Sequence, residues 1–299
     1  MPAADPDQSV VHTVLGPVAA SELGVVAVFE TLLQVLPGAE HAFDITLDRA
    51  KVFETIAAKL LAFRTAGGRT VVDAAGMFHG RDVRLYEALS RATGVHVVAS
   101  TGQGPEGLLG GYFLTPQTNP PTPWPAERWT DLFTREVTEG MVVPRVERRG
   151  SAGLVSTAVT PTGMTPTDES LLRGAARTAL VTGVPASFRA GPDAVAELQV
   201  LLDEGLPPER VLVADFGGLA TSVAVRGAHV VLTDPAAVVA LAEAGHADRA
   251  LLATGGAAAT FGEDAPEASY DRLVRALPED LRDRVLVANP ASLLSVKEL

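Results

Sequence analysis

Four side chains able to hold an anion or move a proton lie at or just beyond the ends of valine-rich runs in this sequence. Arg189, Asp215 and Glu30 fall in the last two residues of three such runs, and His79 lies four residues beyond a fourth. A guanidinium binds carboxylate, phosphate or enolate oxygens through its planar fork, whereas a carboxylate or an imidazole accepts a proton. Together the four residues predict acid–base catalysis on a small organic molecule that carries a carboxylate or a carbonyl group.

Each of these residues also has a purely structural interpretation. Arg189 and Asp215 are expected on adjacent strands, where an ion pair between them would fill space without touching a substrate. Glu30 is compatible with a buried scaffold role, and a loop histidine such as His79 is often only solvated. The sequence leaves both interpretations open for all four residues.

Further polar residues are expected at the same strand ends, as groups that orient the substrate. They are Thr31, Gln103, Ser156 and Thr254. A single hard cation held by Glu30, Asp215 and Asp234 is another alternative, because carboxylate oxygens suit Mg²⁺ and Ca²⁺. A serine hydrolase has little support, because the sequence has no G-x-S-x-G motif.

The elements that must position these side chains alternate between short apolar runs and longer helix-like segments. Eight runs indicate strands: 24–30, 69–75, 95–101, 152–158, 183–189, 210–216, 228–234 and 249–255. Continuous apolar runs indicate strands buried on both faces, as in parallel sheets. Eight strand–helix units predict an α/β fold, a (β/α)8 barrel, with its chemistry at the C-terminal ends of the strands. A doubly wound open sheet is the alternative fold. It would normally carry a glycine-rich phosphate loop after an early strand, and the sequence has no convincing loop of this kind.

Helix signals lie between the strands. The segments 49–67, 82–94 and 167–183 each end in a glycine, which favours the left-handed conformation that terminates a helix. No linker divides the chain, so we expect one domain over residues 1–299. The long irregular segment 104–127 carries three aromatic residues. It is either a lid over the barrel mouth or a contact with a second subunit.

Composition excludes several classes of protein. The formal charge of −12 argues against a nucleic-acid partner, which requires a basic face. The absence of cysteine excludes disulfides, thiolate metal sites and a cysteine nucleophile. No apolar run is long enough to span a membrane, and the polar N-terminus is unlike a signal peptide. We therefore expect a cytoplasmic protein with a small-molecule substrate.

Four segments, taken in order, resemble one known family. They are "HTVLGPVAASELG" (12–24), "VVDAAGMFHGRDVRLYEALSRATGVHVVASTG" (71–102), "TPTDESLLRGAARTALVTGVP" (165–185) and "VLVANPASLLS" (285–295). They resemble the phosphotriesterase family of the amidohydrolase superfamily. The resemblance implies a (β/α)8 barrel preceded by a short β-hairpin, usually a homodimer. It also implies two divalent metals at the C-terminal mouth, which activate a hydroxide for ester, lactone or phosphoester hydrolysis.

The metal ligands of that family are largely replaced in this sequence. The family has a His-x-His on strand 1, a carboxylated lysine or glutamate on strand 4, a histidine on each of strands 5 and 6, and an aspartate on strand 8. The matching positions here are Phe29 and Thr31, Ser156, Arg189, Asp215 and Gly255. Phe29 has no lone pair, Gly255 has no side chain, and Arg189 brings a fixed positive charge. The sequence therefore predicts no metal and no other cofactor at the family site.

Three hypotheses about function follow. The first is a metal-independent hydrolase, lyase or isomerase that acts on a small organic molecule through Arg189, Asp215, Glu30 or His79. The second is a non-catalytic pseudoenzyme that binds a ligand or a partner. The third is residual metal-dependent hydrolysis of an ester, lactone or phosphoester at an unusual site.

Overall fold

The computed structural model describes residues 9–35, 47–77, 79–109, 114–115, 122–143, 147–261 and 266–297. Its main sheet has the strand order β14-β13-β12-β11-β10-β5-β4-β3-β15, and all its pairings are parallel. The strands are β3 (Val25–Val35), β4 (Gly68–Asp73), β5 (His96–Thr101), β10 (Leu154–Ala158), β11 (Ala186–Arg189), β12 (Val211–Ala214), β13 (His229–Leu232), β14 (Ala250–Leu252) and β15 (Ala257–Phe261). All eight predicted strands are present.

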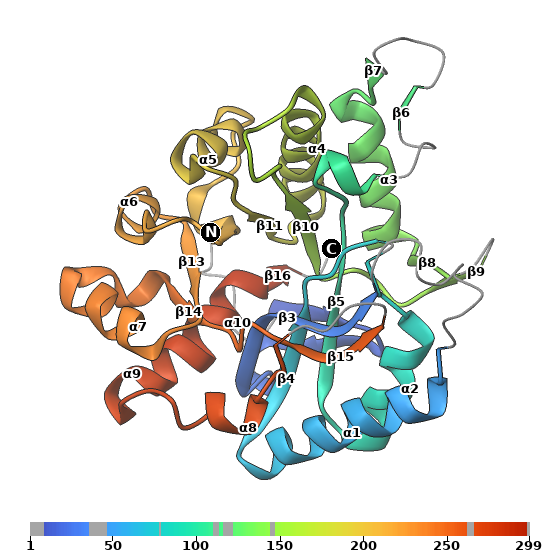
Figure 1. The fold of residues 1–299 in the computed structure, drawn as a ribbon, viewed down its shortest axis with the longest axis vertical. Helices are drawn as coiled ribbons and strands as arrows, with labels where there is room; N and C mark the ends of the chain where they lie inside the picture. Colours follow the sequence, from blue (N-terminus) through green and yellow to red (C-terminus); the bar gives the residue numbers. More distant parts are fainter. Residues whose placement is uncertain are drawn as a thin grey trace, which may run out of the picture.

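The sheet closes where its last strand is split into two parts. β14 pairs with β13, whereas β15 pairs with the second half of β3, from Thr31 to Val35. Between the two parts, the backbone N–H of Thr254 donates to Oε1 of Glu30 on β3 at 2.7 Å. These contacts join the two ends of the curled sheet, and the predicted (β/α)8 barrel is confirmed (Figure 1). Strand β15 is an addition that the sequence analysis did not predict.

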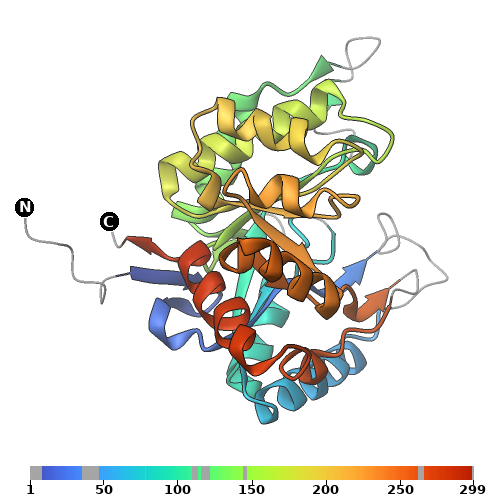
Figure 2. The same ribbon diagram turned by 90° about the vertical axis from the view of Figure 1, so that its left-hand side faces the viewer.

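Helices cover the outside of the sheet in both views (Figures 1 and 2). They are α1 (Arg49–Thr65), α2 (Val83–Thr93), α3 (Ala126–Thr138), α4 (Pro166–Thr182), α5 (Ala194–Asp203), α6 (Ala220–Ala224), α7 (Pro235–Leu241), α8 (Tyr270–Leu273), α9 (Glu279–Asp283) and α10 (Asn289–Leu294). Thr165 caps α4 and forms a capping box with Asp168, while Gly94 and Gly183 end α2 and α4 at φ angles of 67° and 80°. In the described part of the chain, no helix is both long and apolar enough to cross a membrane.

Small antiparallel sheets are present in addition to the main sheet of the barrel. The predicted N-terminal hairpin is formed by β1 (Ser9–Thr13) and β2 (Gly16–Ala19), and β16 (Val296–Lys297) pairs with β1. The others pair β6 (Leu114–Thr115) with β7 (Thr122–Pro123) and β8 (Met141–Val143) with β9 (Glu147–Arg149). Within the segment 104–127, Tyr112 and Phe113 lie outside the described residues, and Trp124 packs on Trp129 of α3 at 4.9 Å between ring centroids. Whether the segment is a lid or a subunit contact stays a prediction.

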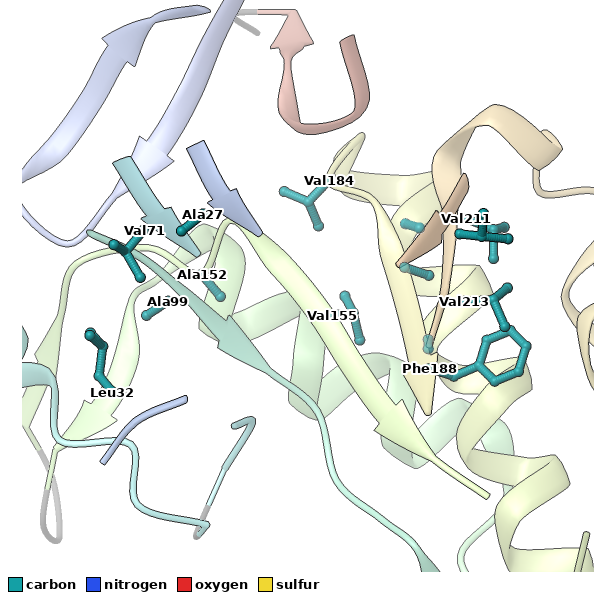
Figure 3. Close-up of a cluster of buried hydrophobic side chains, with 14 of the residues drawn as sticks. Ala27, Leu32, Val71, Ala99, Ala152, Val155, Val184, Phe188, Val211 and Val213 are labelled. Atoms are coloured by element: carbon teal, nitrogen blue, oxygen red, sulfur yellow. The ribbon is translucent and has the colours of Figure 1, made fainter. Parts of the chain in front are cut away.

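Two apolar clusters lie on opposite faces of the barrel wall. The inner cluster fills the barrel and includes Val28, Val72 and Val98. The outer cluster packs the strands against the helices, and Figure 3 shows part of it, including Val71 and Phe188. Neighbouring residues on one strand therefore belong to different clusters, as the two-residue period of a strand requires.

Strand β3 breaks this period once. Ala27 pairs with Val71 and Glu30 pairs with Asp73, so three steps on β3 oppose two steps on β4. The extra residue is a β-bulge, and Phe29 within it has a φ of 59°, which a side chain rarely adopts. The bulge decides which residues of β3 face the barrel interior.

Candidate active site at the barrel mouth

Arg189 and Asp215 meet at the C-terminal ends of β11 and β12. Arg189 is the last residue of β11, and Asp215 directly follows β12, which is the neighbouring strand. Nη1 of Arg189 lies 2.9 Å from Oδ2 of Asp215, so the predicted proximity of these residues is confirmed. The side chains remain 58% and 55% exposed. The pair is therefore accessible to a ligand and is not a buried filler.

Phe29 completes the arrangement around the guanidinium. The Cζ atom of Arg189 lies 5.7 Å from the centroid of the Phe29 ring, a cation–π contact. Phe29 and Asp215 are the only described residues other than glycine with positive φ, at 59° and 57°. Backbone strain of this kind persists where the surrounding structure holds it, and it clusters at functional sites. The strained backbone sets the positions of both residues that contact Arg189.

Two serine hydroxyls join the strand ends on the other side of the mouth. Oγ of Ser156 donates to the carbonyl oxygen of Ala74 at 2.9 Å. Oγ of Ser100 accepts from the backbone N–H of Gly76 at 2.9 Å. Both hydroxyls fix the loop after β4 against β5 and β10. Ser156, predicted to bind substrate, is thus 5% exposed and already engaged with the backbone.

Glu30 lies outside the mouth. It is 1% exposed and, beyond the bulge, shares a strand face with Leu32 of the outer cluster. Its carboxyl group binds both the backbone N–H and the hydroxyl of Thr254. Burial raises the pKa of Glu30 to about 8, against the lowering effect of these two hydrogen bonds. The structure therefore separates Glu30 and Thr254 from Arg189 and assigns them to barrel closure.

The sequence analysis missed Asp73, the carboxylate beside Glu30. Asp73 is fully buried at the end of β4, and its oxygens accept from the backbone N–H groups of Leu32 at 2.7 Å and Ala75 at 3.2 Å. Burial raises its pKa to about 6. An aspartate within the apolar run "TVVDAA" was the available signal, because a buried carboxylate requires hydrogen-bond donors.

His79 and Gln103 lie on the loops that follow β4 and β5. Gln103 is 3% exposed, and its Nε2 has no hydrogen-bond partner among the described residues, which is also true of Nε2 of His79. Burial lowers the pKa of His79, so its imidazole is neutral at neutral pH. Thr31 is half-buried and takes part in the pairing of β3 with β15. These residues lie at the rim, apart from the contacts that Arg189 makes with Asp215 and Phe29.

A buried ion pair supports the same rim. Both terminal nitrogens of Arg81 donate to the carboxylate of Glu136, at 2.5 and 2.9 Å, and Nη1 also donates to the carbonyl oxygen of Ser100 at 3.0 Å. The side chains of Arg81 and Glu136 are 5% and 0% exposed. Arg81, which lies within the family-like segment 71–102, therefore fixes the loop after β4 to β5 and α3.

The donor set at the family's metal positions does not fit two divalent ions. Ser156 donates its proton to a carbonyl, Arg189 is a cation paired with Asp215, and Gly255 has no side chain. Asp234 caps α7 by accepting from Ala236 N–H at 2.9 Å, so the alternative cation site of Glu30, Asp215 and Asp234 is not formed. Across the described ranges, no group of three histidine or acidic side chains is placed to hold an ion.

The chain is a (β/α)8 barrel with an N-terminal hairpin, and its polar groups lie at the C-terminal mouth, where this fold places its chemistry. A model of the phosphotriesterase family matches residues 9–221, and this chain belongs to that family. The match supports the resemblance found in the sequence.

Two relatives match about half of this chain. The chain is 29% identical over 154 residues to an aryldialkylphosphatase from Saccharolobus solfataricus and 21% identical over 163 residues to a phosphotriesterase-related protein from Aedes aegypti. These matches cover 50% and 54% of this chain but span less than half of each relative, 45% and 44%.

Two solved structures superpose with a TM-score of 0.79 at 22% identity, over 95% of this chain. One comes from the molecular engineering of organophosphate hydrolysis activity from a weak promiscuous lactonase template, with 99% of that chain covered. The other is a triple mutant of an organophosphorus hydrolase from Deinococcus radiodurans, with 97% covered. At this identity the likeness supports the fold alone.

Proposed function

We propose that this chain is a metal-independent enzyme on a phosphotriesterase-family barrel. Its substrate is a small organic molecule that carries a carboxylate or carbonyl group. The observation that carries the proposal is the exposed pair of Arg189 and Asp215, 2.9 Å apart, where the family places two of its metal ligands. A cation and a carboxylate side by side provide an oxyanion binder and a proton acceptor without a metal.

Arg189 binds the substrate oxygen in this proposal. The ring of Phe29 lies against the guanidinium, which favours a fixed orientation of its planar fork. The ion pair joins Nη1 of Arg189 to Oδ2 of Asp215. A guanidinium carries five N–H donors, so it can bind an incoming oxygen while it stays paired with Asp215.

Asp215 removes or returns the proton. Its carboxylate lies beside the group that binds the developing negative charge, which is where a general base must be. His79, neutral because burial lowers its pKa, is the second proton acceptor at the rim. The reaction is then a metal-free hydrolysis, an elimination or an isomerisation. We further propose a cytoplasmic homodimer, as is usual for the family.

A second candidate is a pseudoenzyme that binds a ligand without turnover. The contacts that favour it are the same ones: Asp215 already neutralises Arg189, and Phe29 lies against the guanidinium. In this case the mouth binds the same carboxylate-bearing molecules and no product forms.

The test is a turnover screen with a panel of small esters, lactones and carboxylates, on protein treated with a chelator. Arg189→Lys keeps the charge and loses the planar fork, and Asp215→Asn keeps the shape and loses the base. We expect either change to lower kcat/KM at least about a hundredfold, which is the rate enhancement that a general acid or base usually contributes.

Arg226→Ala is the matched control, because Arg226 is an exposed arginine whose Nη1 donates to the carbonyl oxygen of Ser222 in its own helix region. Normal turnover by the Arg189 and Asp215 variants would exclude the proposed roles. Binding without turnover by the wild type would select the pseudoenzyme. Activity lost on chelation and restored by zinc or manganese would select metal-dependent hydrolysis.

A further inference from the structure

A separate cavity of about 200 Å³ opens at the ends of β13 and β14, against α8. Thr233 follows β13 and Thr254 follows β14, so the cavity lies at the same end of the barrel as the mouth. Its other wall includes Ser269 and Arg272, which belong to the N-cap and the body of α8. Neither Arg189 nor Asp215 lines this cavity.

The polar groups of this cavity are mostly unused donors. Arg272 forms no ion pair with any described residue, and the hydroxyls of Thr233 and Ser269 make no hydrogen bond within the described part of the chain. The hydroxyl of Thr254 is different, because it is bound to Glu30. Glu267 also lines the cavity, but its carboxylate lies 3.5 Å from Nζ of Lys59. The guanidinium of Arg272 and the hydroxyls of Thr233 and Ser269 are therefore available to donate hydrogen bonds to a ligand.

The remaining lining is apolar. Leu252, Ala253 and Leu273, which are 2%, 3% and 4% exposed, line the cavity together with Ala276, and these four residues form its apolar floor. An inorganic anion would leave this floor without contacts, whereas a short alkyl chain would bury apolar surface at about 25 cal/mol per Å². The volume is below the roughly 300 Å³ at which drug-sized sites begin, which limits the ligand to a few carbon atoms.

We propose that this cavity binds a short-chain monocarboxylate. The carboxylate accepts from the guanidinium of Arg272 and from the hydroxyls of Ser269 and Thr233, and the alkyl chain packs on Ala253, Leu273 and Ala276. The site is distinct from the Arg189–Asp215 pair and does not depend on the proposed reaction.

The test is a titration of the full chain with butyrate, followed by NMR or calorimetry. We expect saturable binding that Arg272→Gln weakens at least about tenfold, because a charge-assisted pair is lost. Ala276→Leu fills the cavity and abolishes binding while keeping every polar group. Arg275→Gln is the matched control, since Arg275 is exposed two residues beyond α8 and does not line the cavity.

Four outcomes would overturn the assignment. Butyrate does not bind to the wild type, or Arg272→Gln binds it as tightly as Arg275→Gln. Phosphate binds as tightly as butyrate, which would show that the apolar floor contributes nothing. Butyrate binding is lost in Arg189→Lys and kept in Arg272→Gln, which would place the ligand at the mouth. The last result would leave the proposed function standing while this inference fails.

Discussion

The guanidinium of Arg189 lies 2.9 Å from the carboxylate of Asp215, and more than half of each side chain stays exposed to solvent. An exposed pair of this kind typically contributes less than about 1 kcal/mol to the free energy of unfolding. We therefore expect Arg189→Ala and Asp215→Ala each to lower it by less than about 1 kcal/mol. Urea unfolding of both variants and of the double variant measures this, at low and high salt.

This first prediction bears directly on function. A small loss of stability means that turnover or binding by the variants can be interpreted without concern for unfolding. A loss above about 2 kcal/mol for either variant would be typical of a buried pair. It would show that the two residues hold the barrel together, which contradicts their availability to a ligand.

The buried pair of Arg81 and Glu136 is expected to behave in the opposite way. Removing one partner leaves an uncompensated charge in the interior, which costs about 3–5 kcal/mol. Arg81→Ala should therefore lower the free energy of unfolding by that amount in urea. Arg84→Ala is the control, because Arg84 is 60% exposed and pairs with the half-exposed Glu147. If the two variants lost equal free energy of unfolding, burial would not govern how much these ion pairs contribute to stability.

Glu30 and Asp73 make the barrel sensitive to alkaline pH. Burial raises the pKa of Glu30 from 4.5 to about 8 and that of Asp73 from 3.8 to about 6. A carboxyl group with a raised native pKa contributes stability below its unfolded value and loses it as pH rises through the native value. The contribution of these two carboxyl groups to the free energy of unfolding should therefore fall from pH 4.5 to pH 8, and the part of this fall above pH 6 belongs to Glu30.

Glu30→Gln isolates that part. A glutamine mimics the protonated acid, since its amide oxygen accepts from Thr254 N–H and its NH₂ group donates to the Thr254 hydroxyl. We expect the variant to show a flatter stability curve in urea between pH 6 and pH 9. Glu54→Gln, at an exposed position of α1, serves as the control and should follow the wild type. A Glu30→Gln curve parallel to the wild type would mean that Glu30 is ionised in the folded protein.

The strand–helix alternation was predictable because it depends on local apolar runs and helix caps. The direction in which the side chain of Glu30 points was not predictable. The bulge at Phe29 adds one residue to β3, and this moves Glu30 from the expected mouth to the outer wall of the barrel. Strand β15 was missed for a related reason. Its residues "AAATF" carry little strand signal, and its pairing with the distant β3 decides its conformation.

Arg189 and Asp215 were predicted to meet because parallel strands place their last residues at one end of the barrel. The residues that support the rim of the mouth were harder to predict. Arg81 and Glu136 lie 55 residues apart in sequence, and only the packing of α3 against the barrel brings them together. Long-range side-chain pairs of this kind leave no periodic pattern in a single sequence.

His229 makes the protein sensitive to acid. It is 2% exposed at the start of β13. Its burial is the main reason that its pKa is lowered from 6.5 to about 4. The folded state therefore holds the neutral imidazole, while the unfolded chain takes up a proton below pH 6.5. The contribution of His229 to the free energy of unfolding should fall from pH 6.5 to pH 4, with a limiting slope of about 1.4 kcal/mol per pH unit, and above pH 4.5 it opposes the contribution of Glu30 and Asp73. His229→Gln, which cannot take up a proton, should remove this slope in urea unfolding at pH 7, 6, 5 and 4. An unchanged slope in the variant would assign the acid sensitivity to other groups.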